Sequence, residues 1–222
     1  MLKFTTALAF AGAALAAAPA HAALFTIDDF AVIQSVTDVA DGVATTSGAP
    51  IAVAGGLRTI SVNTVGSDLP GQLTTVTSNG DFLDVANSSR VSAAIDITYT
   101  LGAVGGFEDF TVGTLSLIFE ANNPANAVDT TFAIDFVGGG NFSIGPVVVP
   151  AIDTPTPFDI PLTKAQLDAL TGGGTLSLKV NGGNGYDFGL KIVGIQAPEP
   201  GSILLLGAGL LGLGLASRRK RA

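Results

Sequence analysis

The side chains that most often carry out chemistry in proteins are scarce in this sequence. It has no cysteine, and its single histidine is His21. If residues 1–22 are removed as a signal peptide, as argued below, the mature chain has neither residue type. That composition excludes Ser-His-Asp and Cys-His catalysis and the usual zinc ligand sets. It also excludes disulfide bonds, so the stability of the protein must come from packing and backbone pairing.

Carboxylates are the remaining candidates for catalysis. Two Asp or Glu side chains could hydrolyse a glycosidic bond without any other catalytic group. Glu108 and Glu120 are available, but no spacing in the sequence pairs either of them with a second carboxylate. We therefore expect no enzyme activity, and glycoside hydrolysis is the weakest of the functions considered.

Carboxylates could also bind calcium. Asp28 and Asp29 are adjacent, and Asp187 ends a Gly-rich stretch, 182–187, that matches the first six positions of a calcium-binding nonapeptide repeat. That repeat binds calcium only when several copies stack, and this chain has one copy. Two alternatives follow: a structural calcium ion held by Asp28, Asp29 or Asp187, or carboxylates that are solvated in turns. The second is preferred, and no other cofactor is expected.

A carbohydrate site would need exposed aromatic rings, because the C–H faces of sugars stack on them. The chain has no tryptophan and two tyrosines. Tyr99 falls on the apolar side of an alternating segment and is expected in the core, whereas Tyr186 lies in a Gly-rich loop. A carbohydrate-binding module is thus an alternative function, and it would use Tyr186, Asp187 and Arg58.

The last 26 residues combine three features. Pro198-Glu199-Pro200 is followed by an uncharged apolar run, 203–216, and then by the basic residues Arg218, Arg219, Lys220 and Arg221. Extended to about 201–217, the run approaches the minimum length of a helix that crosses a hydrocarbon core of about 30 Å. Basic residues favour the cytoplasmic side, so the rest of the chain is expected outside.

This tail resembles the PEP-CTERM sorting signal of exopolysaccharide-producing Gram-negative bacteria. The resemblance covers residues 197–222, although Ala197 stands where the family usually has Val. It implies recognition and cleavage of the tail by exosortase, a membrane-embedded enzyme that resembles cysteine transpeptidases. The implied route is export, transient anchoring in the inner membrane, and release to the cell surface or medium. The implied role is structural or adhesive, within an extracellular matrix that includes exopolysaccharide.

The N-terminus predicts export independently. Lys3 supplies a positive charge, residues 7–18 are apolar, and Ala20-His21-Ala22 is an A-x-A cleavage site. We therefore expect residues 1–22 to be a signal peptide and the mature chain to begin at Ala23. The exported domain is then 23–196, and 197–222 is the sorting tail.

The exported domain is strongly acidic. Removal of 1–22 and 197–222 takes away five of the ten basic side chains and one of the eighteen acidic ones, which leaves a net charge of −12. Such a domain is repelled by nucleic acid and by anionic lipid, so no nucleic-acid partner is expected.

Period-2 alternation of apolar residues dominates the domain and predicts β-strands. The clearest segment is 91–101, and 131–137, 176–180 and 188–192 alternate in the same way. Further strands are expected over 24–33, 57–65, 72–77, 111–119 and 141–149. Asp81, Asp84 and Asn87 form an oxygen-rich stretch near the turn signal Asn79-Gly80. Nine or ten short strands indicate an all-β sandwich.

One short helix is expected near residue 164. Thr163 and Gln166 have the spacing of a capping box, Leu167 and Leu170 form an apolar side, and Gly172 can end the helix. We expect this helix to close one end of the sandwich.

Three short motifs bear a loose likeness to a known fold. Residues 27–30 (IDDF), 55–63 (GGLRTISVN) and 185–188 (GYDF) resemble jelly-roll domains of the galactose-binding-like type. The resemblance implies a jelly-roll sandwich, to which the C-terminal transmembrane sorting helix is added.

Overall fold

The structure is a computed structural model that describes residues 24–41, 45–66, 71–105, 107, 110–123, 130–152 and 154–196. The signal peptide and the span expected over 201–217 lie outside these residues. So do all the predicted sorting residues: Pro198, Glu199, Pro200, Arg218, Arg219, Lys220 and Arg221. Within the described ranges, no helix has the length and apolar character needed to cross a membrane.

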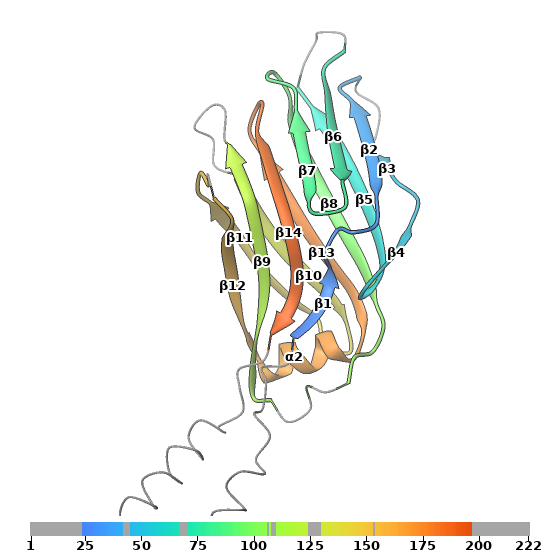
Figure 1. Cartoon of the computed structure of the whole chain (residues 1–222), viewed down its shortest axis with the longest axis vertical. Helices are drawn as coiled ribbons and strands as arrows, with labels where there is room; N and C mark the ends of the chain where they lie inside the picture. The colour runs from blue at the N-terminus through green and yellow to red at the C-terminus, as the bar shows by residue number, and fades with distance from the viewer. Residues whose placement is uncertain are drawn as a thin grey trace, which may run out of the picture. The chain divides into compact units, whose positions relative to one another are not determined.

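Residues Leu24–Gln196 form a compact unit of two antiparallel sheets (Figure 1). The first sheet runs in the order β12 (Thr156–Thr163), β9 (Val112–Asn123), β14 (Asp187–Gln196), β7 (Leu83–Asn87), β6 (Leu73–Ser78) and β2 (Gln34–Val39), and β1 (Leu24–Asp28) also pairs with β14. The second sheet runs β11 (Phe142–Val149), β10 (Thr130–Gly138), β13 (Gly174–Gly182), β8 (Ser92–Leu101), β5 (Gly56–Val65) and β3 (Thr46–Ser47), and β4 (Ile51–Val53) pairs with β5. The predicted all-β sandwich is confirmed.

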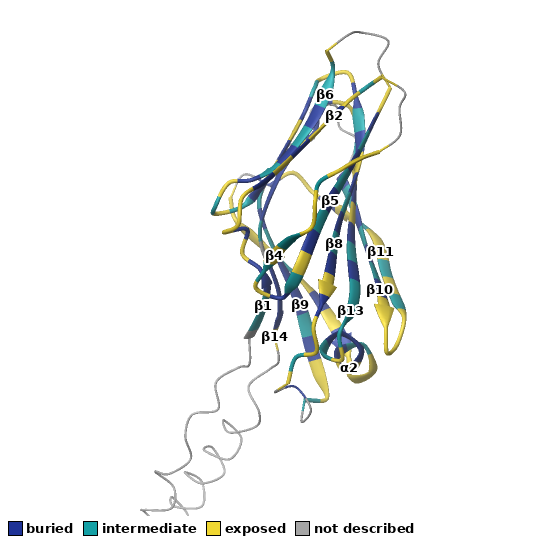
Figure 2. Ribbon diagram, turned by 90° about the vertical axis from the view of Figure 1, so that its right-hand side faces the viewer, coloured by how far each residue is buried: buried dark blue, intermediate teal, exposed yellow. Residues whose placement is uncertain are grey.

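The core lies between the two sheets because apolar residues alternate along each strand (Figure 2). In β8 the buried positions include Ile95, Ile97 and Tyr99, as the sequence pattern predicts. A group of phenylalanine rings fills the region near β9 and β12, where Phe132 meets Phe158 edge to face with centroids 5.1 Å apart. The inner positions that are at most 2% exposed include Ile60, Val62, Val76, Leu115, Leu117, Phe119, Ile134, Phe136, Leu178 and Phe188.

The single helix among the described residues is α2 (Lys164–Thr171), and it has the predicted capping box. The Thr163 hydroxyl accepts a hydrogen bond from the Gln166 backbone N–H, and the Gln166 side chain accepts one from the Thr163 N–H. Leu167 and Leu170 are fully buried. The helix packs near β9, β10, β12 and β13 at one end of the sandwich, as expected (Figure 1).

Several strand predictions need correction. The segment 24–33 is not one strand, because β1 ends at Asp28 and Phe30 takes a left-handed backbone conformation with φ +56°. The oxygen-rich stretch at 81–87, which was not predicted as a strand, is largely strand β7, in which Leu83 and Val85 are buried. Strand β12 was not predicted at all, because it contains Pro157 and Pro161.

The two ends of the compact unit lie side by side. Strand β1 pairs antiparallel with the last part of β14, with Leu24 opposite Gln196 and Phe25 opposite Ile195. On its other side the same part of β14 pairs with β9, with Gln196 opposite Thr114. Residues 193–196 therefore lie in the interior of the first sheet rather than at its edge.

Candidate functional site

Arg58, a predicted ligand-binding residue, points into the core. It lies on β5 in phase with Ile60 and Val62, so strand alternation turns all three side chains inward. Its side chain is 0% exposed. The preceding turn requires glycine at Gly56, where φ is +149° and a Cβ atom would collide with the carbonyl oxygen of Thr100.

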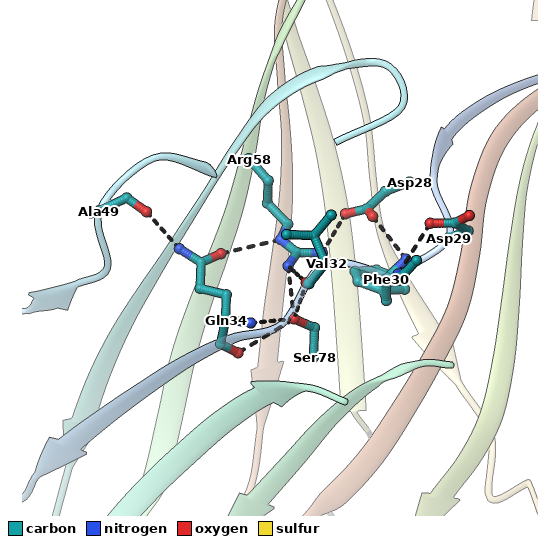
Figure 3. A network of polar contacts seen from close by, with 9 residues as sticks. Asp28, Asp29, Phe30, Val32, Gln34, Ala49, Arg58 and Ser78 are labelled. Atoms are coloured by element: carbon teal, nitrogen blue, oxygen red, sulfur yellow. Dashed lines mark hydrogen bonds and ion pairs between the residues drawn. The ribbon is translucent and has the colours of Figure 1, made fainter. Parts of the chain in front are cut away.

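Four hydrogen bonds hold the Arg58 guanidinium (Figure 3). Nη1 donates to Asp28 Oδ2 at 2.7 Å, and Nε donates to Gln34 Oε1 at 3.2 Å. Nη2 donates to the Val32 carbonyl oxygen and to Ser78 Oγ, both at 2.8 Å. We call Asp28, Phe30, Val32, Gln34, Arg58 and Ser78 the Arg58 network. It joins β5 of one sheet to β1, β2 and β6 of the other.

Asp28 shapes the turn that follows β1. Its Oδ1 accepts a hydrogen bond from the Phe30 N–H at 2.8 Å, while its Oδ2 is paired with Arg58. The Phe30 ring is fully buried, and the Arg58 guanidinium carbon lies 5.2 Å from the ring centroid. Both Asp28 oxygens are thus occupied by groups of the protein itself.

Burial of the charged network alters the pKa of Asp28, which belongs to it, and of Tyr99, which lies beside it. Burial raises the pKa of Asp28 above its usual value, and the Arg58 charge opposes that rise. Tyr99 lies opposite Arg58 in the β5–β8 pairing and is also fully buried. Burial raises the pKa of Tyr99 well above its usual value, and the nearby Asp28 charge adds to the rise.

Tyr186, the expected ligand-stacking ring, is buried instead of exposed. Its side chain is 0% exposed, and its hydroxyl donates to the Ala93 carbonyl oxygen at 3.2 Å. The ring covers Gly182, where any Cβ atom would collide with it, and it stacks near Phe188. The exposed Tyr186 that a carbohydrate-binding module would require is therefore not found, because the loop folds the ring back onto the core.

The three predicted ligand-binding residues do not share a surface. Arg58 and Tyr186 are in the core, while Asp187 is exposed on β14 and accepts a hydrogen bond from the Asn87 N–H at 3.1 Å. Asp187 also lies near Asp84 of the adjacent strand β7. Burial, followed by the Asp187 charge, raises the pKa of Asp84.

The three predicted metal ligands, Asp28, Asp29 and Asp187, each contact other groups of the protein. Asp28 is paired with Arg58, and exposed Asp29 accepts a hydrogen bond from the Ala31 N–H at 3.1 Å. Asp187 lies toward the start of β14, whereas β1, which ends at Asp28, pairs with the opposite end of that strand. In the part of the chain that the structure describes, no three His, Cys, Asp or Glu side chains are grouped closely enough to hold a metal ion.

Of the two carboxylates considered for glycoside hydrolysis, Glu120 alone lies among the described residues. Glu120 forms an ion pair with Lys191 at 3.0 Å, and Glu108 lies outside the described residues. What the structure assembles from the predicted residues is Asp28 with Arg58. Sequence reasoning missed Gln34, Ser78 and Phe30, which complete this network. Available signals were the phase of Arg58 with Ile60 and the Asp28–Phe30 spacing.

Comparison with solved structures finds carbohydrate-binding modules at low similarity. The family 11 module of the cellulosomal cellulase Lic26A-Cel5E of Clostridium thermocellum is 10% identical, with a TM-score of 0.39, over 79% of this chain and 95% of that one. TmCBM61, solved with β-1,4-galactotriose, is 11% identical, with a TM-score of 0.37, over 62% and 86%. The xylan-binding module CBM15 is 12% identical, with a TM-score of 0.34, over 70% and 99%. Likenesses of this size specify no ligand for this chain.

No curated protein matches the sequence. A family model does match its C-terminal part, over residues 196–220. The match begins at Gln196, the last residue of β14 and of the compact unit. It covers the Pro-Glu-Pro triplet, the apolar run and three of the four terminal basic residues. The chain thus carries a PEP-CTERM protein-sorting motif at its C-terminus, directly after the folded β-sandwich.

Proposed function

We propose that this protein is exported, held for a time in the inner membrane by its tail, and then cut at the tail by an exosortase-type enzyme. The released β-sandwich serves as a structural or adhesive component of an extracellular polysaccharide layer at the cell surface. The observation that supports this most is the sorting motif at 196–220. The signal peptide expected over 1–22 agrees with it.

The described domain supports a binding or structural role more than a catalytic one. Of its buried ionic residues, Arg58 and Asp28 neutralise each other, and Asp38 accepts hydrogen bonds from the Thr46 hydroxyl and the Thr64 N–H. Glu120 is paired with Lys191. We therefore propose that the domain is not an enzyme.

Carbohydrate binding remains an alternative, but with fewer of the residues proposed for it. Two of the three residues proposed for it, Tyr186 and Arg58, are buried. A sugar would have to be bound by exposed polar side chains, of which Asp187 is one. Structural calcium likewise remains only a proposal. It predicts that a chelator lowers the melting temperature of the released protein and that added calcium restores it.

A change at Glu199 tests the proposed sorting route. Replacing Glu199 with Ala should leave export intact, because export depends on the first 22 residues, but it should stop removal of the tail. The variant should accumulate in the native host as an uncleaved, membrane-bound precursor, detected by immunoblotting of membrane and medium fractions. Ser202→Ala, just beyond the triplet, is the control and should be processed normally. Release of Glu199→Ala at the normal rate would show that the triplet is only a linker.

A further inference from the structure

The strand from which the tail leaves is paired on both sides up to its last residue. Gly194, Ile195 and Gln196 pair with β1 on one side and with β9 on the other. Val193 and Ile195 are also fully buried. A peptidase binds its substrate as an extended segment whose backbone N–H and C=O groups are free. Residues 193–196 offer no free strand edge while β1 is in place.

β1 is the weaker of the two strands that pair with the last residues of β14. It has five residues and begins at Leu24, next to the N-terminus expected after signal-peptide cleavage. A short terminal strand of this kind frays unless other contacts hold it. If β1 separated, the last residues of β14 would become the edge of a sheet and would be open to a protease.

The Arg58 network holds β1 at the end opposite its free terminus. Asp28 is the last residue of β1, and its carboxylate forms an ion pair with Arg58 of the second sheet. One residue earlier, the Ile27 carbonyl oxygen accepts a hydrogen bond from the Gly55 N–H at 2.7 Å. The Gly55 backbone lies so close to Ile27 that a Cβ atom at Gly55 would be 2.8 Å from the Ile27 Cα. These contacts attach β1 to both sheets.

A buried ion pair adds little net stability compared with apolar residues of similar size, so its presence calls for another reason. Here the pair joins the first strand of the domain to the second sheet, and that strand covers the residues just before the sorting motif.

We propose that β1, held by the Arg58 network, sets the N-terminal limit of tail processing. The enzyme can cut the bond that follows Gln196 or any bond nearer the C-terminus, but no bond before Gln196. This inference rests on the proposed function for its biological meaning, although the protection itself does not. In the cleavage step one peptide C–N bond breaks. Water adds its hydroxyl group to the carbonyl carbon, and the tail leaves with the remaining proton as a new amino terminus.

Limited proteolysis of the full chain, purified in detergent, tests this protection without any sorting enzyme. A broad-specificity protease and mass spectrometry locate the C-terminal cuts. In the wild type we expect every early cut near the end of β14 to fall after Gln196.

Asp28→Asn places an amide against the Arg58 donors and releases β1. It should speed cutting within 193–196 at least tenfold, because cleavage follows the population of the open form. Asp135→Asn is the matched control, since it removes an exposed Asp–Lys ion pair far from β1 in the chain and should leave the cuts unchanged.

A second variant covers the case in which Asp28→Asn unfolds the whole domain, which cuts within β8 would reveal. Phe25→Ala removes packing of β1 opposite Ile195 and leaves the ion pair intact, so it should give the same faster cutting at 193–196. Wild-type cuts before Gln196, or neither variant being cut faster there, would overturn the proposal.

The same variants in the native host separate this proposal from the proposed function. We expect the released wild-type protein to end at residue 196 or later, and released Asp28→Asn to include shorter C-termini. If the host never removes the wild-type tail, the proposed function fails, while the proteolysis result still decides whether β1 protects β14.

Discussion

At the scale of single residues, the buried Arg58 side chain depends on the polar groups around it. Its guanidinium is fully buried and always charged, so each donor without an acceptor would cost the desolvation of a charged group. Asp28, Gln34, Ser78 and the Val32 carbonyl supply those acceptors. The sequence predicts Arg58 as a ligand-binding residue, whereas in the structure its guanidinium binds groups of the protein itself.

Replacing Arg58 with Met should therefore destabilise the domain strongly. The change leaves the Asp28 carboxylate buried without its cation, and breaking a buried pair in this way costs about 3–5 kcal/mol. Urea unfolding followed by circular dichroism measures the loss. Adding Asp28→Leu to Arg58→Met should recover most of it, because the remaining charge is also removed. Lys179→Met, which breaks the exposed pair with Asp135, should cost no more than about 1 kcal/mol. A loss as small as this control for Arg58→Met would contradict the network.

The loss of stability in Arg58→Met should depend on pH in a defined direction. Burial raises the pKa of Asp28 in the folded protein, so the folded state binds a proton more readily than the unfolded state. Such a group contributes its full stability below its unfolded pKa, and the contribution is lost as pH rises through the folded pKa. Arg58 opposes the rise in pKa, so its removal moves that pKa higher still. The difference in melting temperature between wild type and Arg58→Met should thus be smaller at pH 5 than at pH 7.5. An equal difference at both values would show that the Asp28 charge is not responsible.

At the scale of elements, one outer strand of each sheet contains proline. β12 has Pro157 and Pro161, and β11 has Pro146. Proline is tolerated at a sheet edge where its missing N–H would point to solvent. It also removes donors that a second sheet could use, which protects the edge from pairing with another molecule.

Changing both Pro157 and Pro161 to Thr should make the protein self-associate through β12. Threonine restores two outward N–H groups and favours extended structure, so the edge becomes a template for another strand. Light scattering coupled to size-exclusion chromatography should show oligomers that grow with concentration. Pro155→Thr, an exposed change just before β12, is the control and should stay in the wild-type state. A double variant that behaves like this control would remove the prolines from the explanation.

The elements also show which parts of the fold are predictable from sequence. β8 and β10 follow strict alternation, and α2 begins at a capping box, so local pattern alone identifies them. β12 was hidden by its two prolines, since only its place at the sheet edge makes them tolerable. β1 was predicted too long, because the Asp28 carboxylate that ends it is bound by Arg58, thirty residues away. The burial of Tyr186 could not be predicted for a similar reason: the Gly182 backbone that its ring covers is not visible in a local pattern.

At the scale of the whole molecule, the two ends of the compact unit lie on paired strands, with Leu24 opposite Gln196. The expected N-terminal cut falls between Ala22 and Ala23, and the sorting motif begins at Gln196. In the sequence, both expected cuts therefore fall next to strands that pair with each other. The expected product, residues 23–196, is an acidic β-sandwich without cysteine, so it must fold without disulfide bonds.

The intact mass of the protein from its native host tests the central claim most directly. We predict a major species that begins at Ala23, ends at residue 196 or later, and lacks the basic residues 218–221. The reasons are the A-x-A site before Ala23, the sorting motif at 196–220, and the doubly paired end of β14. A major species that keeps Arg218 to Arg221 would contradict the account and leave the tail as a simple membrane anchor.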